Sequence, residues 1–340
     1  MTLENTKRAQ VKRAQVLVTG AGGFIGGHLV AKLLKIHSKD HIRAVDIKPL
    51  DQWHQLFEDV DNLAVDLQDV DACKRVCQGI DHVYNLAANM GGIGFIEHNK
   101  ALCMLSVLIN TNMLLAAKQA GVSRYFFASS ACVYNADKQK STQIKPLSEE
   151  DAYPAMPEDG YGWEKLFSER MCRHFSEDFG LITRVARLHN VYGPYGTWRG
   201  GREKAPAAIC RKVIEAKVNQ RRDIEIWGTG HQTRSFMYVD DCVEGILKIM
   251  ESDINFPINL GSSELVSVNQ LVDFVEQIGE IKLNRFYKLD APKGVNGRNS
   301  DNTKILHHLN WQPNTRLMAG LRQTYDWIYG QFTQTAVHSR

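Results

Sequence analysis

Several signatures of metal-binding, membrane and nucleic-acid-binding proteins are missing from this 340-residue sequence. Its seven cysteines form no Cys-x-x-Cys pair and its twelve histidines form no His-Glu-x-x-His motif, so we expect no metal site. A net charge of +3 is too small to indicate a nucleic-acid partner. The most apolar stretch, residues 101–117, is interrupted by serine, threonine and asparagine, so we expect a packed helix and no membrane-spanning segment.

The cysteine count also bears on the cellular compartment. The number is odd, and the N-terminal residues contain no hydrophobic core typical of a secretory signal. We therefore expect no framework of disulfides. We expect a cytoplasmic protein whose thiols are reduced.

Apolar runs alternate with helical patterns through the first half of the chain. Helical patterns follow or separate these runs at 24–37, at about 98–120 and at about 161–179. The runs expected as strands are 15–20, 41–47, 62–67, 82–88, 124–131 and 181–188. Strands that alternate with helices favour a parallel sheet covered on both faces, so we expect a doubly wound α/β fold of the Rossmann type.

The pattern loosens after residue 188, where glycine, proline and arginine cluster before a helix expected from Pro206. We therefore expect residues 15–187 to form a nucleotide-binding domain, to which 236–262 returns with two short strands. A smaller mixed α/β substrate-binding domain is expected from 188–235 and 263–335, and residues 1–14 are expected to form a frayed tail.

A glycine-rich loop follows the first expected strand. Gly20, Gly23 and Gly26 stand where the backbone must turn tightly, approach a pyrophosphate and open a helix whose N-terminus attracts anions. Asp46 ends the next strand, at the spacing typical of a carboxylate that binds the adenosine ribose. A carboxylate there repels a 2′-phosphate, which favours NAD over NADP, although Lys48 acts in the opposite direction.

A tyrosine and a lysine follow at helical spacing. Tyr161 and Lys165 stand four residues apart, on one face of an expected helix, so the lysine cation should lower the pKa of the phenol. A phenol that accepts a proton beside a nicotinamide can promote oxidation of an alcohol. Ser130, at the end of a buried strand, is placed to hydrogen-bond the same oxygen.

These residues together resemble the extended short-chain dehydrogenases that act on nucleotide sugars. The resemblance extends over about residues 15–330 and narrows within that family to 3,5-epimerases of GDP-hexoses. Two positions depart from the pattern of that group, because Asn89 stands for an aspartate and Gly160 for an alanine. The segments that carry the narrower resemblance are AANMGGIGFI (87–96), SSACVY (129–134), residues 187–212, HQTRSF (231–236) and GRNSDN (297–302).

The resemblance implies bound NAD, a GDP-hexose substrate, a homodimer, and a sugar oxidised transiently at C4. It also implies that Cys132 and Lys204 form an acid–base pair on opposite faces of the sugar, which inverts C5 and C3. Related dehydratases carry an acid where Cys132 stands. Four nearby cations and the helix N-terminus should favour a neutral amine at Lys204, and a thiolate at Cys132 if folding brings the two residues together; the cations are Arg199, Arg202, Arg211 and Lys212.

The expected site comprises more than the acid–base pair. The residues expected to bind NAD are Gly20, Gly23, Phe24, Ile25, Gly26, Asp46, Asp66, Leu67, Ala87, Tyr161 and Lys165. Those expected to act in catalysis are Ser130, Cys132, Tyr161, Lys165 and Lys204. Those expected at the substrate, with the cations suited to a diphosphate, are Gly91, Gly92, Ser130, Ala131, Cys132, Asn190, Glu203, Lys204, Lys212, Gln232, Thr233, Arg234 and Arg298.

Other functions stay open at this point. The same fold accommodates nucleotide-sugar 4-epimerases and 4,6-dehydratases, and epimerases of a related GDP-heptose or GDP-deoxyhexose. A dehydratase is disfavoured because Cys132 stands where an acid is needed, and a 4-epimerase would leave Cys132 and Lys204 without a role. A non-enzymatic NAD-binding protein would not need the Tyr161–Lys165 pair.

Overall fold

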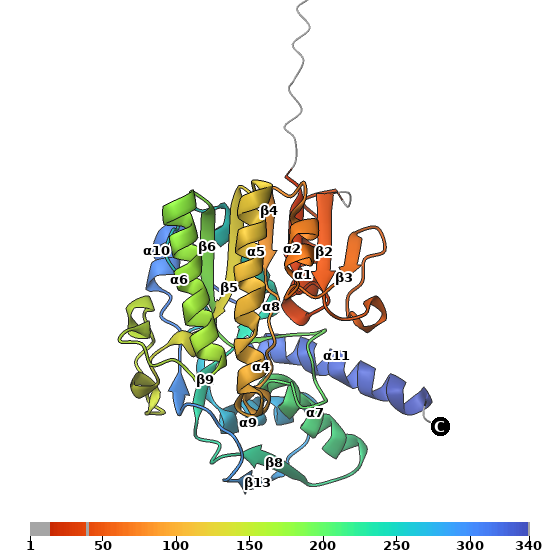
Figure 1. Cartoon of the computed structure of the whole chain (residues 1–340). Coiled ribbons are helices and arrows are strands. Elements are labelled where there is room, and N and C mark those ends of the chain that lie inside the picture. The colour runs from red at the N-terminus through yellow and green to blue at the C-terminus, as the bar shows by residue number, and fades with distance from the viewer. Residues whose placement is uncertain (1–13, 39–40, 339–340) are drawn as a thin grey trace, which may run out of the picture.

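A computed structural model describes residues 14–38 and 41–338 of the chain; residues 1–13 of the expected N-terminal tail lie outside this part. Its centre is a parallel sheet of seven strands in the order β11-β6-β5-β4-β1-β2-β3 (Figure 1). The strands are β1 (Val16–Thr19), β2 (Ile42–Asp46), β3 (Asp61–Ala64), β4 (His82–Asn85), β5 (Arg124–Ser130), β6 (Ile182–Leu188) and β11 (Ile258–Leu260). The expected doubly wound α/β fold is confirmed.

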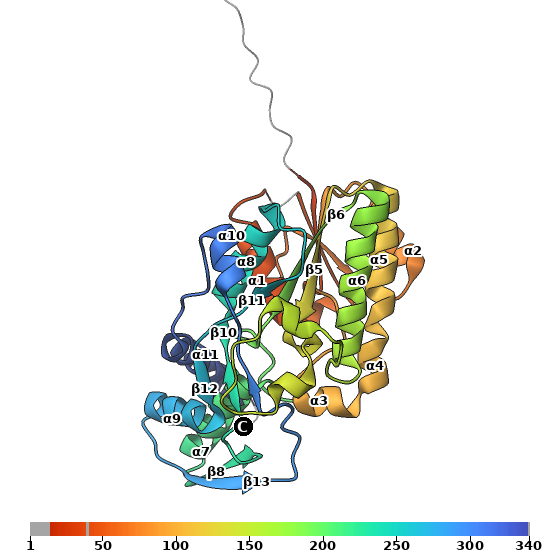
Figure 2. The ribbon, with the colours of Figure 1, turned by 90° about the vertical axis from the view of Figure 1, so that its left-hand side faces the viewer.

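Helices cover both faces of this sheet. On one face α2, α5 and α6 lie side by side, and on the other α1 packs against α8 (Figure 2). The bounds are α1 (Phe24–Leu33), α2 (Val70–Cys77), α5 (Ser106–Ala120), α6 (Tyr161–Phe179) and α8 (Val239–Glu251). Two short helices, α3 (Ile93–His98) and α4 (Lys100–Met104), precede α5, so the long helix expected from about 98 to 120 is broken at Leu105.

A smaller mixed region lies beyond the carboxyl ends of the strands (Figure 1). Its helices are α7 (Ala205–Val218), α9 (Val268–Gly279) and α11 (Leu317–His338), which pack on one another. Its strands are β8 (Asp223–Trp227) with β13 (Asn284–Lys288), and β12 (Leu265–Ser267), β9 (Thr233–Ser235) and β14 (Gly297–Arg298) in a second small sheet. α10 (Thr303–Leu309) then packs on β11. The helix expected from Pro206 is confirmed.

One expected strand differs from the structure. The run from Phe236 to Asp241 contributes only β10 (Met237–Tyr238), which pairs with β7 (Val191–Tyr192) outside the large sheet. The rest of the run begins α8, because Asp240 and Asp241 in its first turn complement the positive end of the helix. The second expected strand is confirmed, since β11 pairs with β6.

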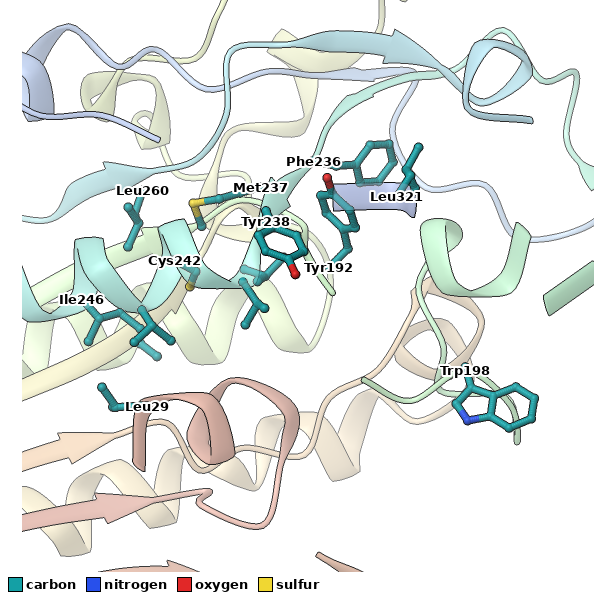
Figure 3. Packing of buried hydrophobic residues seen from close by; sticks show 14 of the residues in the cluster. Leu29, Tyr192, Trp198, Phe236, Met237, Tyr238, Cys242, Ile246, Leu260 and Leu321 are labelled. Atoms are coloured by element: carbon teal, nitrogen blue, oxygen red, sulfur yellow. The ribbon is translucent and has the colours of Figure 1, made fainter. Parts of the chain in front are cut away.

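A continuous hydrophobic core joins the two regions. Leu29 of α1 and Ile246 of α8 belong to the same buried cluster as Tyr192 of β7 and Leu321 of α11 (Figure 3). Burial of apolar area contributes about 25 cal/mol per Å². The shared core therefore holds the smaller region firmly against the sheet and fixes the cleft between them.

The apolar stretch around α5 has two distinct sides. Among the described residues, Lys100–Ala120 is long and apolar enough to cross a membrane by length and composition alone. One side is buried against α2 and α6 and includes Ile109, Met113 and Leu114. The other side leaves Leu105 and Leu108 exposed.

Candidate active site

The glycine-rich loop joins β1 to α1 at the carboxyl edge of the sheet. Gly20 has a φ of +69°, a conformation that side chains strongly disfavour. A Cβ atom at Gly26 would lie 2.1 Å from the Gly20 carbonyl oxygen, so this helix could not approach the loop with any larger residue. The first turn of α1, which begins at Phe24 and Ile25, thus presents free backbone N–H groups beside an open backbone surface.

The ends of the neighbouring strands complete this edge. Asp46 is 7% exposed and accepts one hydrogen bond, from the Lys48 amide at 3.0 Å, which leaves a carboxylate oxygen for a ribose hydroxyl. The Lys48 ammonium donates to the Gly22 carbonyl at 3.2 Å, so its charge is held by the loop. Asp66 stands beyond β3 with the buried Leu67, and Ala87 stands just beyond β4.

These features fit a dinucleotide. The glycine cradle would be filled by any Cβ, the helix N-terminus faces it, and the acidic side chain at the end of β2 suits an unphosphorylated ribose. NAD held there supplies the reversible oxidation of a substrate alcohol.

The serine and cysteine follow β5 directly. Ser130 ends the strand and accepts a hydrogen bond from the Cys132 amide at 3.2 Å, which starts the short turn η3 (Ala131–Val133). A Cβ at Gly162 would lie 2.4 Å from the Cys132 carbonyl oxygen, so α6 packs tightly against this turn. Tyr161 begins α6 and is 5% exposed. Its phenol lies beside Ser130.

The electrostatic environment of Tyr161 differs from the expectation. Burial, the nearby Cys132 thiol and the Glu164 carboxyl hold the pKa of Tyr161 well above its usual range, and the hydrogen bond with Ser130 only partly offsets them. The Lys165 ammonium lies 5.5 Å from the centre of the Tyr161 ring and 3.6 Å from a Glu164 carboxylate oxygen. The expected lowering of the phenol pKa by Lys165 is therefore wrong, because burial raises the pKa most and Glu164 lies close to the lysine charge.

Cys132 is the second difference. Burial and the Glu158 carboxylate raise the pKa of Cys132 to about 11, although the Arg298 guanidinium, 3.6 Å from the sulfur, acts to lower it. The expectation of a thiolate was wrong, because it rested on cations near Lys204 and took no account of burial or of Glu158.

Lys204 lies at the N-cap of α7, next to the loop that contains Gly91 and Gly92. The Gly92 amide donates to the Arg202 carbonyl at 3.0 Å, and a Cβ at Gly92 would lie 2.3 Å from the Glu203 carbonyl oxygen. Burial lowers the pKa of Lys204; the nearby Cys132 acts in the opposite direction, and Arg298 adds to the lowering. The expected direction is confirmed, but burial is the main cause, and the cation that adds to it is Arg298 of β14 and not one of the arginines that surround Lys204 in sequence.

One cavity of about 260 Å³ brings most of the expected substrate residues together. Thr233 is not among its lining residues and donates its hydroxyl to the Thr142 carbonyl at 2.6 Å. The expected residues that line the cavity are Gly91, Gly92, Ser130, Ala131, Cys132, Tyr161, Asn190, Glu203, Lys204, Lys212, Gln232, Arg234 and Arg298.

The three cations expected at a diphosphate all carry partners within the protein. Lys212 donates to the Glu225 carbonyl at 2.8 Å, and Arg234 donates to the Val295 carbonyl at 2.6 Å. Arg298 donates its Nε to the Gln139 amide oxygen at 2.7 Å and pairs with Glu158. Because a guanidinium has five N–H donors, both arginines keep N–H groups that are not used in these bonds.

Sequence reasoning missed several lining residues, and the polar or aromatic side chains of Glu158, Glu225 and Trp227 are among them. Glu158 stands three residues before Tyr161, and that proximity was the available signal. Glu225 and Trp227 alternate along β8, so their side chains share one face of the strand. Gly160, one of the two departures from the family pattern, has a φ of +68° and suits glycine for that reason.

No group of three or more histidine, cysteine, aspartate or glutamate side chains that could hold a metal ion occurs within the described part of the chain. The site instead combines a dinucleotide cradle with a serine, a tyrosine and a lysine at the carboxyl edge of a Rossmann sheet. This combination defines an NAD-dependent enzyme of the short-chain dehydrogenase type.

Comparison with known proteins gives the family. A family model described as "NAD dependent epimerase/dehydratase family" matches residues 16–261. The chain belongs to this family and is an NAD-dependent epimerase of the nucleotide-sugar type.

Curated relatives are similar over almost the full length. The chain is 46% identical to GDP-mannose 3,5-epimerase of Arabidopsis thaliana, over 97% of this chain and 86% of the relative. It is also 46% identical to GDP-mannose 3,5-epimerase 1 of Oryza sativa subsp. japonica, over 97% of this chain and 85% of the relative.

Solved structures share the fold. A UDP-glucose 4-epimerase of Thermotoga maritima superposes with a TM-score of 0.83 at 24% identity and covers 93% of this chain and 99% of its own. A UDP-glucuronic acid 4-epimerase of Bacillus cereus, solved with UDP-glucuronic acid and NAD, superposes with a TM-score of 0.77 at 26% identity. The match covers 93% of this chain and 99% of the Bacillus chain.

Proposed function

We propose that this chain is a GDP-mannose 3,5-epimerase. The observation that carries the proposal is the placement of Cys132 and Lys204 in one cavity with Ser130 and Tyr161. Inversion needs two proton-exchanging groups, because a single base would return the proton to the face that it left. The similarity to the plant epimerases supports GDP-mannose as the substrate. Inversion at C5 and C3 gives GDP-L-galactose, and inversion at C5 alone gives GDP-L-gulose.

The protein groups divide the chemistry between them. Ser130 and Tyr161 hold the C4 oxygen, and Tyr161 takes and later returns its proton. With a ketone at C4, the hydrogens on C3 and C5 become acidic. Cys132 and Lys204 then exchange protons with these carbons from opposite faces. The pKa of Cys132 is raised to about 11, so the resting thiol carries a transferable proton, and burial acts to lower the pKa of Lys204.

The outer end of the cavity suits guanine. Trp227 is 40% exposed and offers an aromatic face, and Glu225 accepts a hydrogen bond from its indole at 3.0 Å through one carboxylate oxygen. The second oxygen is left for the N1–H and 2-amino donors that distinguish guanine from uracil. Comparing the affinities of GDP, inosine diphosphate and UDP for wild type and Glu225→Gln tests this assignment. It requires that the substitution weaken GDP binding selectively.

A homodimer is part of the proposal. Leu105, at the N-cap of α5, and Leu108 on α5 are 45% and 42% exposed, and Trp163 and Phe167 on the adjoining α6 are 44% and 52% exposed. A second copy related by a two-fold axis would cover the same apolar face on both chains. Light scattering after gel filtration should give twice the chain mass, and Leu108→Glu should yield monomer. The control Phe286→Glu, on β13, should stay dimeric.

We further propose a cytoplasmic location, with no membrane or nucleic-acid partner and no metal. All seven cysteines are free, which suits a reducing compartment. Fractionation of cells that express the tagged protein should place it in the soluble fraction without nuclease treatment. Recovery with the membrane pellet would contradict the proposal.

A direct test of the activity uses several nucleotide sugars. Purified protein supplied with NAD is incubated separately with GDP-mannose, UDP-glucose and UDP-glucuronic acid, and products are separated by chromatography. We expect new hexose isomers from GDP-mannose alone. A 4-epimer of a UDP-sugar, or a 4-keto-6-deoxy product from GDP-mannose, would replace the proposal with the 4-epimerase or the dehydratase reading. Conversion of a GDP-heptose or GDP-deoxyhexose in preference to GDP-mannose would change the sugar only.

A further inference from the structure

The wall of the cavity behind Cys132 is a buried cluster of three polar side chains. Arg298 donates from Nη1 to the Cys132 sulfur at 3.6 Å, from Nε to the Gln139 amide oxygen at 2.7 Å, and from Nη2 to the Glu158 carboxylate. The Arg298 side chain is 5% exposed and that of Glu158 is 15% exposed. The ion pair therefore acts at short range and is screened little by solvent.

The backbone ties Glu158 to both catalytic segments. The Glu158 amide donates to the Cys132 carbonyl at 2.9 Å, and the Gly162 amide donates to the Glu158 carbonyl at 2.8 Å. Glu158 thus bridges the turn that carries Cys132 and the helix that begins with Tyr161. A shift of Glu158 would move the thiol and the phenol relative to each other.

The Glu158 carboxylate offsets the positive charges around the Cys132 sulfur. The cations that act on Cys132 or are acted on by it are Arg298, Arg234 and, when protonated, Lys204. The neutral groups beside it are Ser130 and the Tyr161 phenol. Glu158 is the carboxylate that opposes these cations. Without it, the buried positive charge would stabilise a thiolate.

The ion pair is held in its charged form. Burial alone would raise the pKa of Glu158, but Arg298 and the hydrogen bonds from Cys132 and Arg298 keep it below its usual range. Burial would likewise lower the pKa of Arg298, and Glu158 raises it. The pair therefore stays charged over the working pH range.

We propose that Glu158 is a positioning residue for the acid–base step, which holds Arg298 against Cys132 and offsets its charge, so that the sulfur keeps its proton until the substrate reacts. The catalytic use of that proton rests on the proposed epimerase function. The protonation of Cys132 in the free protein does not depend on that function, so it can be tested separately.

The test measures ionisation of Cys132 in the full-length protein without substrate. Wild type, Glu158→Gln and Glu158→Asp are treated with iodoacetamide across a pH series, and alkylation of Cys132 is followed by peptide mass spectrometry. Asp159→Asn is the matched control, because Asp159 is the adjacent carboxylate but pairs with Lys100 at 2.7 Å on the surface. Thermal unfolding of each variant reports whether it is folded.

We expect Glu158→Gln to raise the alkylation rate at pH 8 by about tenfold or more, since each unit of pKa lowering gives tenfold more thiolate. Glu158→Asp, which keeps the charge, should stay closer to wild type, and Asp159→Asn should match it. Equal alkylation rates of wild type and Glu158→Gln at every pH would overturn the proposal. An increase in rate as large in Asp159→Asn as in Glu158→Gln would also overturn it.

A second readout covers the case in which the reagent reaches the sulfur too slowly in every variant. The ultraviolet absorbance of the thiolate is then titrated in wild type and Glu158→Gln, with Cys132→Ser as the blank. A titration midpoint that falls by about one unit or more in Glu158→Gln supports the proposal, and an unchanged midpoint overturns it. If GDP-mannose proves not to be a substrate, both measurements retain their meaning, because neither contains it.

Discussion

Replacing Cys132 by alanine should separate the two halves of the proposed chemistry. Ser130, Tyr161 and Lys165 are untouched, so oxidation at C4 should persist. The group on one face of C3 and C5 is lost, so neither centre can be inverted. General acid–base groups contribute about 10²- to 10⁴-fold, and each inversion needs this one, so the rate of epimer formation should fall by at least 10²-fold.

The structure indicates that this loss would not come from unfolding. Cys132 is 9% exposed at the wall of a cavity, so removing its sulfur should cost about 1 kcal/mol or less of unfolding free energy, by comparison with a buried methylene. Arg298 keeps its bonds to Gln139 and Glu158 when the sulfur is gone. A serine variant should be nearly as poor, because a hydroxyl is a much weaker acid than even a thiol whose pKa is about 11.

The assay follows both halves at once. GDP-mannose is incubated with the Cys132→Ala variant in heavy water, the absorbance of the reduced cofactor is recorded, and the sugars are analysed by chromatography and mass spectrometry. We expect reduced cofactor without epimer. Recovered GDP-mannose should contain deuterium in its original configuration if Lys204 exchanges protons from its own face. Normal epimer formation would return Cys132 to the status of a buried structural residue.

Three further predictions follow from the site and its surroundings. Tyr161→Phe should lower turnover by about 10²- to 10⁴-fold with little change in substrate affinity, and activity within a few-fold of wild type would remove Tyr161 from the mechanism. Lys204→Ala should still reduce the cofactor but fail to invert C5 and C3, and a normal rate with normal affinity would refute the two-base mechanism. Burial lowers the pKa of His189 to about 3, so folding disfavours its protonated form. Its contribution to stability is complete above about pH 6.5 and is lost as the pH falls toward 3, and the loss reaches about 1.4 kcal/mol at pH 5.5. We expect the free energy of unfolding, measured in urea at a series of pH values, to depend less steeply on pH in His189→Gln than in wild type. The same dependence on pH in both proteins would contradict this.

The fold and the cofactor end could be predicted because their signals are local. The spacing of Gly20, Gly23 and Gly26 determines a turn, and the separation of four positions between Tyr161 and Lys165 determines a shared helix face. The run from Phe236 to Asp241 was harder, because a short apolar segment fits a strand or a buried helix equally well. Its second half begins α8, where Asp240 and Asp241 complement the positive end of the helix.

The electrostatics of the site could not be predicted in the same way. Arg298 meets Cys132 across 166 residues of sequence, and no periodic pattern connects them. Glu158 stands close to Tyr161 in sequence, yet its effect depends on the loop that carries its carboxylate to Arg298. The expectation of a thiolate failed for this reason, since it used charges that are near in sequence while burial and Glu158 determine the result.

The position of deuterium in the product shows whether C5 and C3 are inverted by proton exchange. Wild-type protein with NAD converts GDP-mannose in heavy water, and the product is analysed by proton magnetic resonance and mass spectrometry. We expect inverted centres at C5 and C3, each carrying deuterium, and the original hydrogen at C4, because only C3 and C5 exchange protons with Cys132 and Lys204. A product inverted at C4, or inverted at C5 and C3 without deuterium, would contradict it.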